Sequence, residues 1–547
     1  MEKIDKRKIF LIIIIVLILL VIALFVGKFT FSYLGPNISD DASNKGEITA
    51  SGDTIIFNNG KALTLSATTD NFKTGGTNLT STTNPTAKLV ASSKTNKADA
   101  TYYVGVYIKN NTYTYSTTAK TPEVLLTIKD EKGSNVTSVD GLTYTTSGGV
   151  SGFDVTEKSG LFNVKTDYPI TTTSSTTGTT HTWTFTLTFI NLSTDQSVNE
   201  NATMNIDVVL QQEMYHIPRF DEICDETTLA CHVAKLYTGT QGKNNIYYHN
   251  GTIKSDSEFR IVTTTYPAGT VLDANDGSYR YAGASESVNN FVCFGSNESP
   301  CPTDNLYRII GVFGDQVKLI KYDYANSNLL GTDGDYNSWS TYSKSAYPTY
   351  KGELTTINRY YWNYKNDTNI NNQMGSNEWS TSLFNKTNLN INYLNKFDAT
   401  WKNMIEDTTW KVSGHTSVDA TPSLMYTAEI TKASKTYGPS DGVSKIGLMY
   451  ASDYGFAADP SAWTTTLYNY SSSSITSVNW MYMGLYEWPM TPYSSGSIDV
   501  LDLNSSGTLE IHAAVDSYGA RPVLYLKSSV LYAGGTGTKD SPITIVV

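Results

Sequence analysis

The stretch "HTWTFTLTFI", residues 181–190, sets the fold class of the first half of the chain. Large apolar side chains alternate in it with threonines, and the apolar set comprises Trp183, Phe185, Leu187 and Phe189. Successive side chains of a strand point to opposite faces, so the pattern predicts a strand with one buried face and one face coated by threonine. Such two-sided strands are typical of antiparallel sheets.

Neighbouring segments repeat this alternation. "MNIDVVL" at 204–210 places Met204, Ile206, Val208 and Leu210 on one face, and further strands are predicted at 102–110 and 122–130. In "TIIFNNGKALTLS", residues 54–66, the Asn-Gly pair predicts a hairpin, because a tight turn needs positive φ. No helical periodicity interrupts this half, so residues 50–215 are predicted to form an antiparallel β-sandwich.

The N-terminus predicts a membrane anchor. Basic residues Lys3, Lys6, Arg7 and Lys8 precede an uncharged apolar run over 9–27. Nineteen helical residues roughly match the ~30 Å hydrocarbon core, and the basic flank favours a cytoplasmic N-terminus. We therefore expect a cytoplasmic tip (1–8), a single-pass signal anchor in the bilayer (9–27) and a linker (28–49), with the rest extracellular at the cell membrane. A cleaved signal peptide is the competing interpretation.

Four cysteines fit an exported chain. Cys224 and Cys231 form one close pair in sequence, and Cys293 and Cys301 form another. In an oxidising compartment this favours two local disulfides, although four cysteines allow three connectivities. Neither pair has the shorter spacing of a zinc site.

A helix and a second domain follow the sandwich. Apolar residues recur at helical spacing after Thr227 and Thr228, either of which suits an N-cap, so a connecting helix is predicted within 216–240. Residues 241–547 mix short strands, helices and long loops, which predicts an irregular α+β domain. Hairpins are expected in 305–321, turning at Gly314-Asp315, and in 499–513, turning at Ser506-Gly507.

Several phrases of this second half resemble a family of surface proteins from Gram-positive bacteria without an assigned activity. They are "SYRYAGAS" (278–285), "NLYRIIGVFGDQVKLIK" (305–321), "NEWSTSLFNKTNLNINYLN" (377–395), "IGLMYASDYGFA" (446–457), "WPMTPYSS" (488–495) and "GARPVLYLKSSV" (519–530). The resemblance implies a domain similar to formylglycine-generating enzymes and C-type lectins. The sandwich resembles, more loosely, camelysin and TasA-type surface proteins.

The sequence indicates no catalytic chemistry. The cysteine spacing does not fit the copper-binding pair of the formylglycine-generating enzymes, and Glu487-Trp488-Pro489 is not the order of a lectin calcium triplet. No H-E-x-x-H or P-loop string occurs. His512 is interpreted as a strand surface residue. A net charge of −11 with no basic stripe argues against nucleic-acid binding. We expect no enzyme activity, metal or cofactor.

Aromatic residues supply the candidate binding site. One loop-rich segment concentrates them beside polar groups, and its predicted ligand-binding residues are Asn479, Trp480, Tyr486, Glu487, Trp488 and Tyr493. Aromatic faces with a few placed polar groups suit glycans and protein interfaces. The alternative is that the tryptophans fill the core of an irregular fold.

A structural role is predicted for Arg521 and Pro522, which open the apolar run 523–526. Proline costs least at the start of a strand, and a buried arginine needs a carboxylate or carbonyls for its guanidinium.

The sequence therefore predicts a membrane-anchored surface protein with a non-catalytic adhesion head for a glycan or a surface-protein ligand. A fibre or biofilm-matrix subunit that polymerises through the sandwich is the alternative, and a cell-envelope enzyme is a third.

Overall fold

A computed structural model of the chain describes residues 45–50, 53–68, 76–364, 375–431 and 442–546. The chain divides into two compact units, Met1–Ile217 (unit 1) and Pro218–Val547 (unit 2). Within the described ranges, no helix is both long enough and apolar enough to cross a membrane. The predicted anchor at 9–27 lies outside these ranges.

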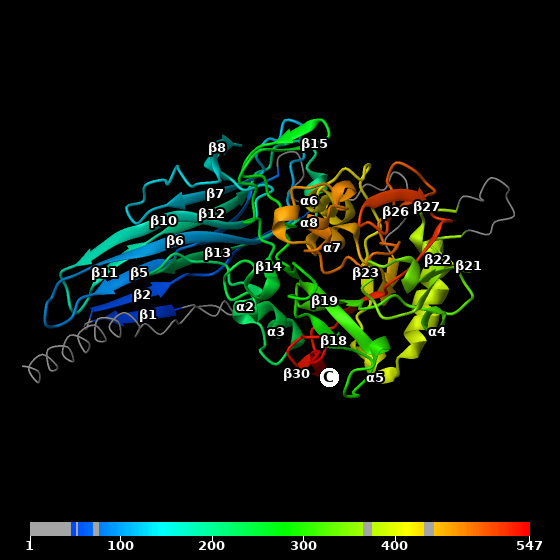
Figure 1. Cartoon of the computed structure of the whole chain (residues 1–547). Coiled ribbons are helices and arrows are strands. Elements are labelled where there is room, and N and C mark those ends of the chain that lie inside the picture. The colour runs from blue at the N-terminus through cyan, green and yellow to red at the C-terminus, as the bar shows by residue number, and fades with distance from the viewer. Residues whose placement is uncertain (1–44, 51–52, 69–75, 365–374, 432–441, 547) are drawn as a thin grey trace, which may run out of the picture. The chain divides into compact units, whose positions relative to one another are not determined.

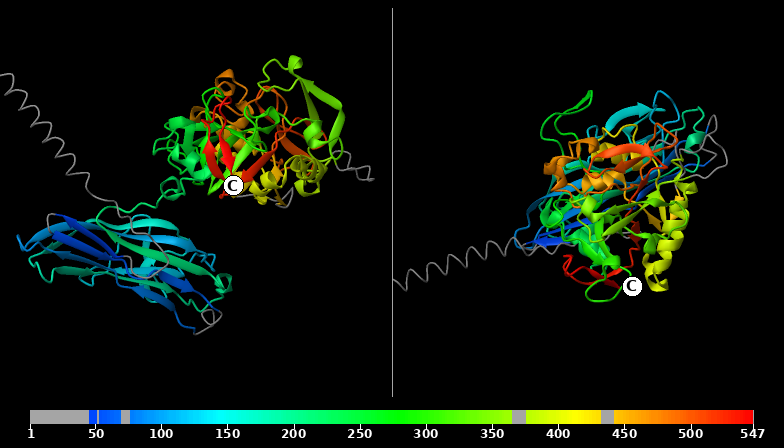
Figure 2. Two further views of the ribbon diagram at one scale, coloured as in Figure 1. Left: turned by 90° about the horizontal axis from the view of Figure 1, so that it is seen from below. Right: turned by 45° about the vertical axis from the view of Figure 1, so that its right-hand side comes forward.

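The described residues of unit 1 form three antiparallel sheets (Figure 1). The first has the order β1 (Lys45–Ala50), β2 (Asp53–Asn58), β5 (Thr86–Val90), β11 (Thr179–Thr182). The second has the order β10 (Gly160–Thr172), β6 (Ala98–Asn111), β13 (Thr203–Gln211), β3 (Leu63–Ser66). The third has the order β4 (Leu79–Thr83), β12 (Thr184–Phe189), β7 (Val124–Lys129), β9 (Val150–Asp154), β8 (Thr143–Ser147). Figure 2 shows these strands from two further directions.

The alternating stretch that predicted the sandwich lies at a junction between two of these sheets. Its four large apolar side chains are fully buried in one core that all three sheets enclose. The stretch is not one strand, however, because β11 pairs with β5 and β12 pairs with β4 and β7. The break falls at Trp183, whose N–H donates to Pro85 O at 3.0 Å. Pro85 lacks an N–H and cannot return the bond, so the ladder is interrupted there and the chain changes sheet.

The predicted hairpin at Asn59-Gly60 is wrong. Gly60 does adopt a positive φ of 72°, but the flanking strands do not pair with each other. β2 pairs with β1 and β5, whereas β3 pairs with β13 in a different sheet. The turn therefore carries the chain from one sheet to another, which local sequence does not distinguish from a hairpin.

Unit 2 is built around a larger antiparallel sheet with the order β14 (Ile246–Tyr248), β17 (Tyr279–Tyr281), β19 (Leu306–Phe313), β20 (Gln316–Lys321), β29 (Val523–Leu526), β25 (Ile446–Gly447). β18 (Phe291–Cys293) also pairs with β19. The predicted hairpin at Gly314-Asp315 joins β19 to β20 and is confirmed. Strand β29 therefore lies in the interior of the sheet, between β20 and β25.

Short strands and helices surround this sheet. Two- and three-stranded ladders are formed by β15 (Phe259–Ile261) with β16 (Thr264–Tyr266), β21 (Tyr336–Ser343) with β22 (Thr356–Tyr361) and β28 (Ser517–Tyr518), β23 (Thr408–Trp410) with β24 (Gly442–Ser444), β26 (Asp499–Leu503) with β27 (Leu509–Ala513), and β30 (Leu531–Gly534) with β31 (Thr544–Val546). The α-helices are α2 (Phe220–Ile223), α3 (Leu229–Lys235), α4 (Ser327–Leu330), α5 (Ala399–Met404), α6 (Pro422–Tyr426), α7 (Ala451–Phe456) and α8 (Ser473–Thr476). Residues Phe384–Tyr393 and Thr427–Thr431 form π-helices.

The predicted connecting helix lies inside unit 2. Thr228 caps α3 by accepting a hydrogen bond from Cys231 N at 3.3 Å. The apolar residues of α3 belong to the main core of unit 2. His232, on the same helix, stacks on Tyr532 with ring centroids 3.6 Å apart.

Both predicted disulfides are confirmed. Cys224 is bonded to Cys231, and Cys293 is bonded to Cys301, with Cα atoms 5.4 Å and 5.8 Å apart. Each closes a short loop within unit 2. Disulfides of this kind persist in oxidising compartments, which favours an extracytoplasmic location for unit 2.

Candidate functional site

The structure buries most of the aromatic segment that sequence reasoning chose as a binding surface. Trp480 is 1% exposed and Trp488 is 0% exposed. Their indole N–H groups donate inside the protein, to Tyr281 O at 2.8 Å and to Tyr360 O at 2.7 Å. Asn479 is also fully buried and donates to Tyr454 O at 3.0 Å. These three residues stabilise the core, so their assignment to a solvent-facing binding surface is wrong.

Glu487 is buried as well, and its partner is the arginine singled out for a structural role. Arg521 Nε and Nη2 donate to the two Glu487 carboxylate oxygens at 2.7 and 2.9 Å. Nη2 also donates to Met481 O at 2.8 Å, and Tyr324 donates to Glu487 at 3.1 Å. Pro522 lies one residue before β29 and accepts from Lys321 N at 2.9 Å. The guanidinium thus joins the last core strand to the irregular loops.

Tyr486 and Tyr493 are the members of the segment that remain partly exposed. Tyr486 precedes two residues that form backbone pairings on both sides. Glu487 forms an antiparallel bridge with Leu503 of β26, and Trp488 N donates a hydrogen bond to Gly519 O. This pairing holds the Tyr486 ring next to the β26–β27 hairpin.

The tyrosine rings near Tyr486 form a layered cluster, here called the tyrosine face and defined as Tyr342, Tyr347, Tyr486 and Tyr518. Tyr486 stacks on Tyr518 at 5.0 Å and on Tyr342 at 6.4 Å, and Tyr347 packs edge-on against Tyr342 at 5.0 Å. Tyr342 and Tyr518 are buried supports, whereas Tyr347 and Tyr486 are partly exposed. Buried rings that fix partly exposed rings produce a rigid aromatic surface.

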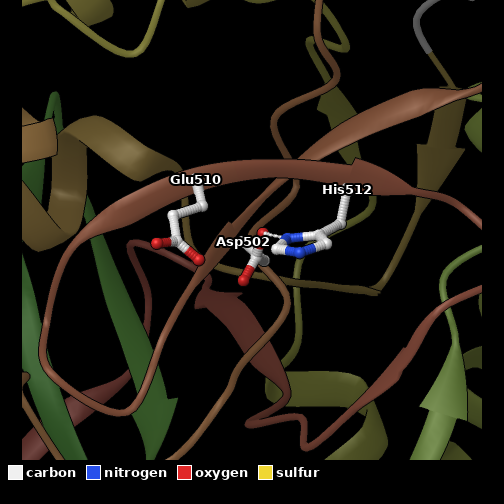
Figure 3. Close-up of side chains that lie close together, drawn as sticks. All are labelled: Asp502, Glu510 and His512. Carbon is white, nitrogen blue, oxygen red and sulfur yellow. Dashed lines mark hydrogen bonds and ion pairs between the residues drawn. The ribbon is translucent and has the colours of Figure 1, made fainter.

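A cluster of titratable side chains lies on the β26–β27 hairpin (Figure 3). It borders the tyrosine face through the contact between the His512 and Tyr518 rings. Asp502 is directly opposite Glu510 in the ladder, and His512 lies two residues beyond Glu510. Residues i and i+2 of a strand share a face, so Glu510 and His512 both point toward Asp502. One ligand-type atom from each of the three side chains lies within 4.8 Å of the others. We call these three residues the Asp–Glu–His cluster.

Hydrogen bonds and burial determine the protonation of the cluster. His512 Nδ1 lies 2.6 Å from Asp502 Oδ1, and the His512 ring is 5.7 Å from the Tyr518 ring. The hydrogen bond to Asp502 raises the pKa of His512. Burial raises the pKa of the Asp502 carboxyl to about 6, against the lowering effect of His512. Glu510 accepts from Asn504 Nδ2 at 2.9 Å.

Sequence reasoning assigned His512 to the strand surface and did not connect it with Asp502. The signal was nevertheless present, because the predicted hairpin of 499–513 turns near Ser506-Gly507 and its register pairs Asp502 with Glu510. An aspartate facing a glutamate across an antiparallel ladder is unfavourable without a compensating group. That pairing marks the cluster as unusual before any contact is measured.

The chain matches no family model, no curated protein and no solved structure in the three comparisons made.

Proposed function

We propose that the chain is a membrane-anchored surface protein of a bacterium, in which unit 2 is a non-catalytic recognition head that binds a glycan at the tyrosine face. The observation that carries the proposal is the stack of Tyr486 on Tyr518 and Tyr342, bordered by the polar groups of Glu510 and His512. The proposal keeps the predicted binding function and moves its site from the buried tryptophans to the partly exposed tyrosines.

The chemistry of the tyrosine face suits a sugar. Pyranose rings present apolar C–H faces that pack on aromatic rings, while their hydroxyls need hydrogen-bond donors and acceptors at the edge. Glu510 supplies acceptors, His512 supplies a donor or an acceptor, and Arg359 lies over the Tyr342 ring at 4.6 Å. Arg359 is held by donation from Nε to Ser517 O, so its position is fixed before a ligand binds.

An extracellular setting is part of the proposal. Two disulfides in unit 2 and the basic, then apolar N-terminal sequence both favour export with retention at the membrane. The resemblance of residues 225–545 to lectin-like surface domains points in the same direction. Recognition of a host or bacterial glycan is a function that such a location permits.

A glycan array probed with the full chain, purified in detergent, tests the proposal. We expect the wild-type chain to bind a restricted set of glycans, and Tyr486→Ala to weaken that binding at least about 10-fold, because it removes a stacking surface. Tyr468→Ala is the matched control, since Tyr468 is 49% exposed and is not part of the tyrosine face. Equal binding by Tyr486→Ala and the wild type would exclude this site, and no bound glycan would exclude the ligand class.

A further inference from the structure

We propose that Asp502, Glu510 and His512 bind one divalent transition-metal cation, with Zn²⁺ as the best match to this set of donors. The proposal concerns the cation alone and does not depend on the glycan or on any ligand of the tyrosine face.

The three side chains converge from two strands of one hairpin. Asp502 comes from β26, while Glu510 and His512 come from β27 on the face that looks toward it (Figure 3). Ligand atoms about 2.0–2.2 Å from a tetrahedral zinc ion lie about 3.4 Å apart. The three atoms here already lie within 4.8 Å of one another, so modest side-chain rotations complete the geometry. Glu510 and His512 are partly exposed and can rotate by exchanging their hydrogen bonds to Asn504 and Asp502 for bonds to the metal, whereas Asp502 is fixed by burial.

A buried oxygen without a partner is an independent observation that points to a ligand. Asp502 is 0% exposed, and its Oδ2 atom has no hydrogen-bond partner among the described residues. A buried carboxylate oxygen normally accepts a hydrogen bond or binds a cation, because leaving it unpaired costs the full desolvation penalty. The other oxygen of the same group is already engaged by His512. Oδ2 is therefore an unused ligand atom in the interior of the cluster.

The local charge also lacks compensation. Asp502 faces Glu510 across the ladder, and Asp516 adds further negative potential at both Asp502 and His512. Within the described residues, neither Asp502 nor Glu510 forms an ion pair with a lysine or an arginine. A protonated His512 neutralises one carboxylate at most. A dication neutralises both and removes the repulsion that the register imposes.

The donor set selects the kind of metal. Imidazole nitrogen combined with carboxylate oxygen suits Zn²⁺ and related first-row dications, whereas Ca²⁺ and Mg²⁺ prefer all-oxygen sites. Binding displaces the proton between His512 Nδ1 and Asp502 Oδ1, so affinity rises with pH as these groups lose their protons. The other ionisable groups facing the cluster are Asp516, Tyr342, Tyr486 and Tyr518. The tyrosines remain neutral in this range.

Isothermal titration of the untagged full chain with Zn²⁺, after removal of metal by a chelator, tests the site. We expect one equivalent to bind, with affinity that increases between pH 5.5 and 7.5 as on the order of one proton is released. Asp502→Asn and Glu510→Gln should each weaken this binding at least about 10-fold, because each removes a ligand charge. His415→Gln is the matched control, since His415 is a partly exposed histidine of unit 2 that contacts Ser417 outside the cluster.

If Asp502→Asn does not fold, the effect of Zn²⁺ on the melting temperature of the other variants still tests the site. Zn²⁺ should raise the melting temperature of the wild type and of His415→Gln, and should not raise that of Glu510→Gln, whose position is partly exposed and tolerant. Binding of Zn²⁺ by Glu510→Gln and Asp502→Asn with wild-type affinity and stoichiometry would overturn the proposal. Absence of Zn²⁺ binding by the wild-type chain would overturn it as well.

Discussion

Replacing Arg521 by alanine tests how unit 2 is held together. The Arg521–Glu487 pair is buried, with side-chain exposures of 1% and 3%. The substitution removes two hydrogen bonds to Glu487 and one to Met481 O, and it leaves the Glu487 carboxylate with Tyr324 as its remaining hydrogen-bond donor. Stranding a buried charge in this way costs about 3–5 kcal/mol. The unfolding entropy scales with chain length, and unit 2 has roughly 330 residues. Dividing the free-energy loss by this entropy gives an expected drop in melting temperature of about 4–7 °C.

Differential scanning calorimetry measures this effect, with Arg260→Ala as the control because Arg260 is exposed on β15. A second variant separates charge from packing. Arg521→Ala combined with Glu487→Gln removes the stranded charge, so it should recover part of the lost stability. A shift below about 1 °C in Arg521→Ala, or no recovery in the double variant, would refute a buried, charge-paired role for Arg521.

Three further outcomes are expected. Burial raises the pKa of Glu429 to about 7 from 4.5, so its contribution to stability is fully present below pH 4.5 and is lost as pH rises through 7. Glu429→Gln should therefore reduce the fall in unfolding free energy between pH 5 and 8, measured by urea titration, by about 2.5 kcal/mol. Trp488→Ala should destabilise unit 2 by about 3–5 kcal/mol, because it opens a core cavity, and calorimetry measuring less than 1 kcal/mol would contradict its burial. Mass spectrometry of the denatured, unreduced chain should find no thiol that reacts with iodoacetamide; an alkylated Cys293 or Cys301 would contradict the second disulfide.

Alternation of apolar and polar residues predicted the β-rich architecture well, because period-2 burial is a local property of each strand. It identified β13 and the apolar face of β12, while the Gly314-Asp315 turn identified the β19–β20 hairpin. Which strands pair with one another was harder to predict from the sequence. The chain turns at Gly60, whose φ is positive, but the turn connects two sheets, since the partners β5 and β13 are distant in sequence.

The sequence did not predict which residues of the aromatic segment are buried and which are exposed, because burial depends on how the loops pack in three dimensions. Trp480 and Trp488 lie in loops, yet an irregular fold with short strands fills its core from those loops, and backbone carbonyls satisfy both indole N–H groups. Tyr486 is partly exposed, whereas its chain neighbours Glu487 and Trp488 are buried. The His512–Asp502 contact depends on hairpin register and was recoverable only by combining the turn with the pairing across it.

Hydrogen–deuterium exchange of the full chain, with and without a glycan identified on the array, tests the central claim most directly. The account predicts slower amide exchange on binding in peptides that cover 499–518 and 342–350, which contain the β26–β27 hairpin and the edge of the tyrosine face. Protection confined to the sheets of unit 1, or to parts of unit 2 away from these segments and from Tyr486, would contradict the claim that recognition takes place at the tyrosine face.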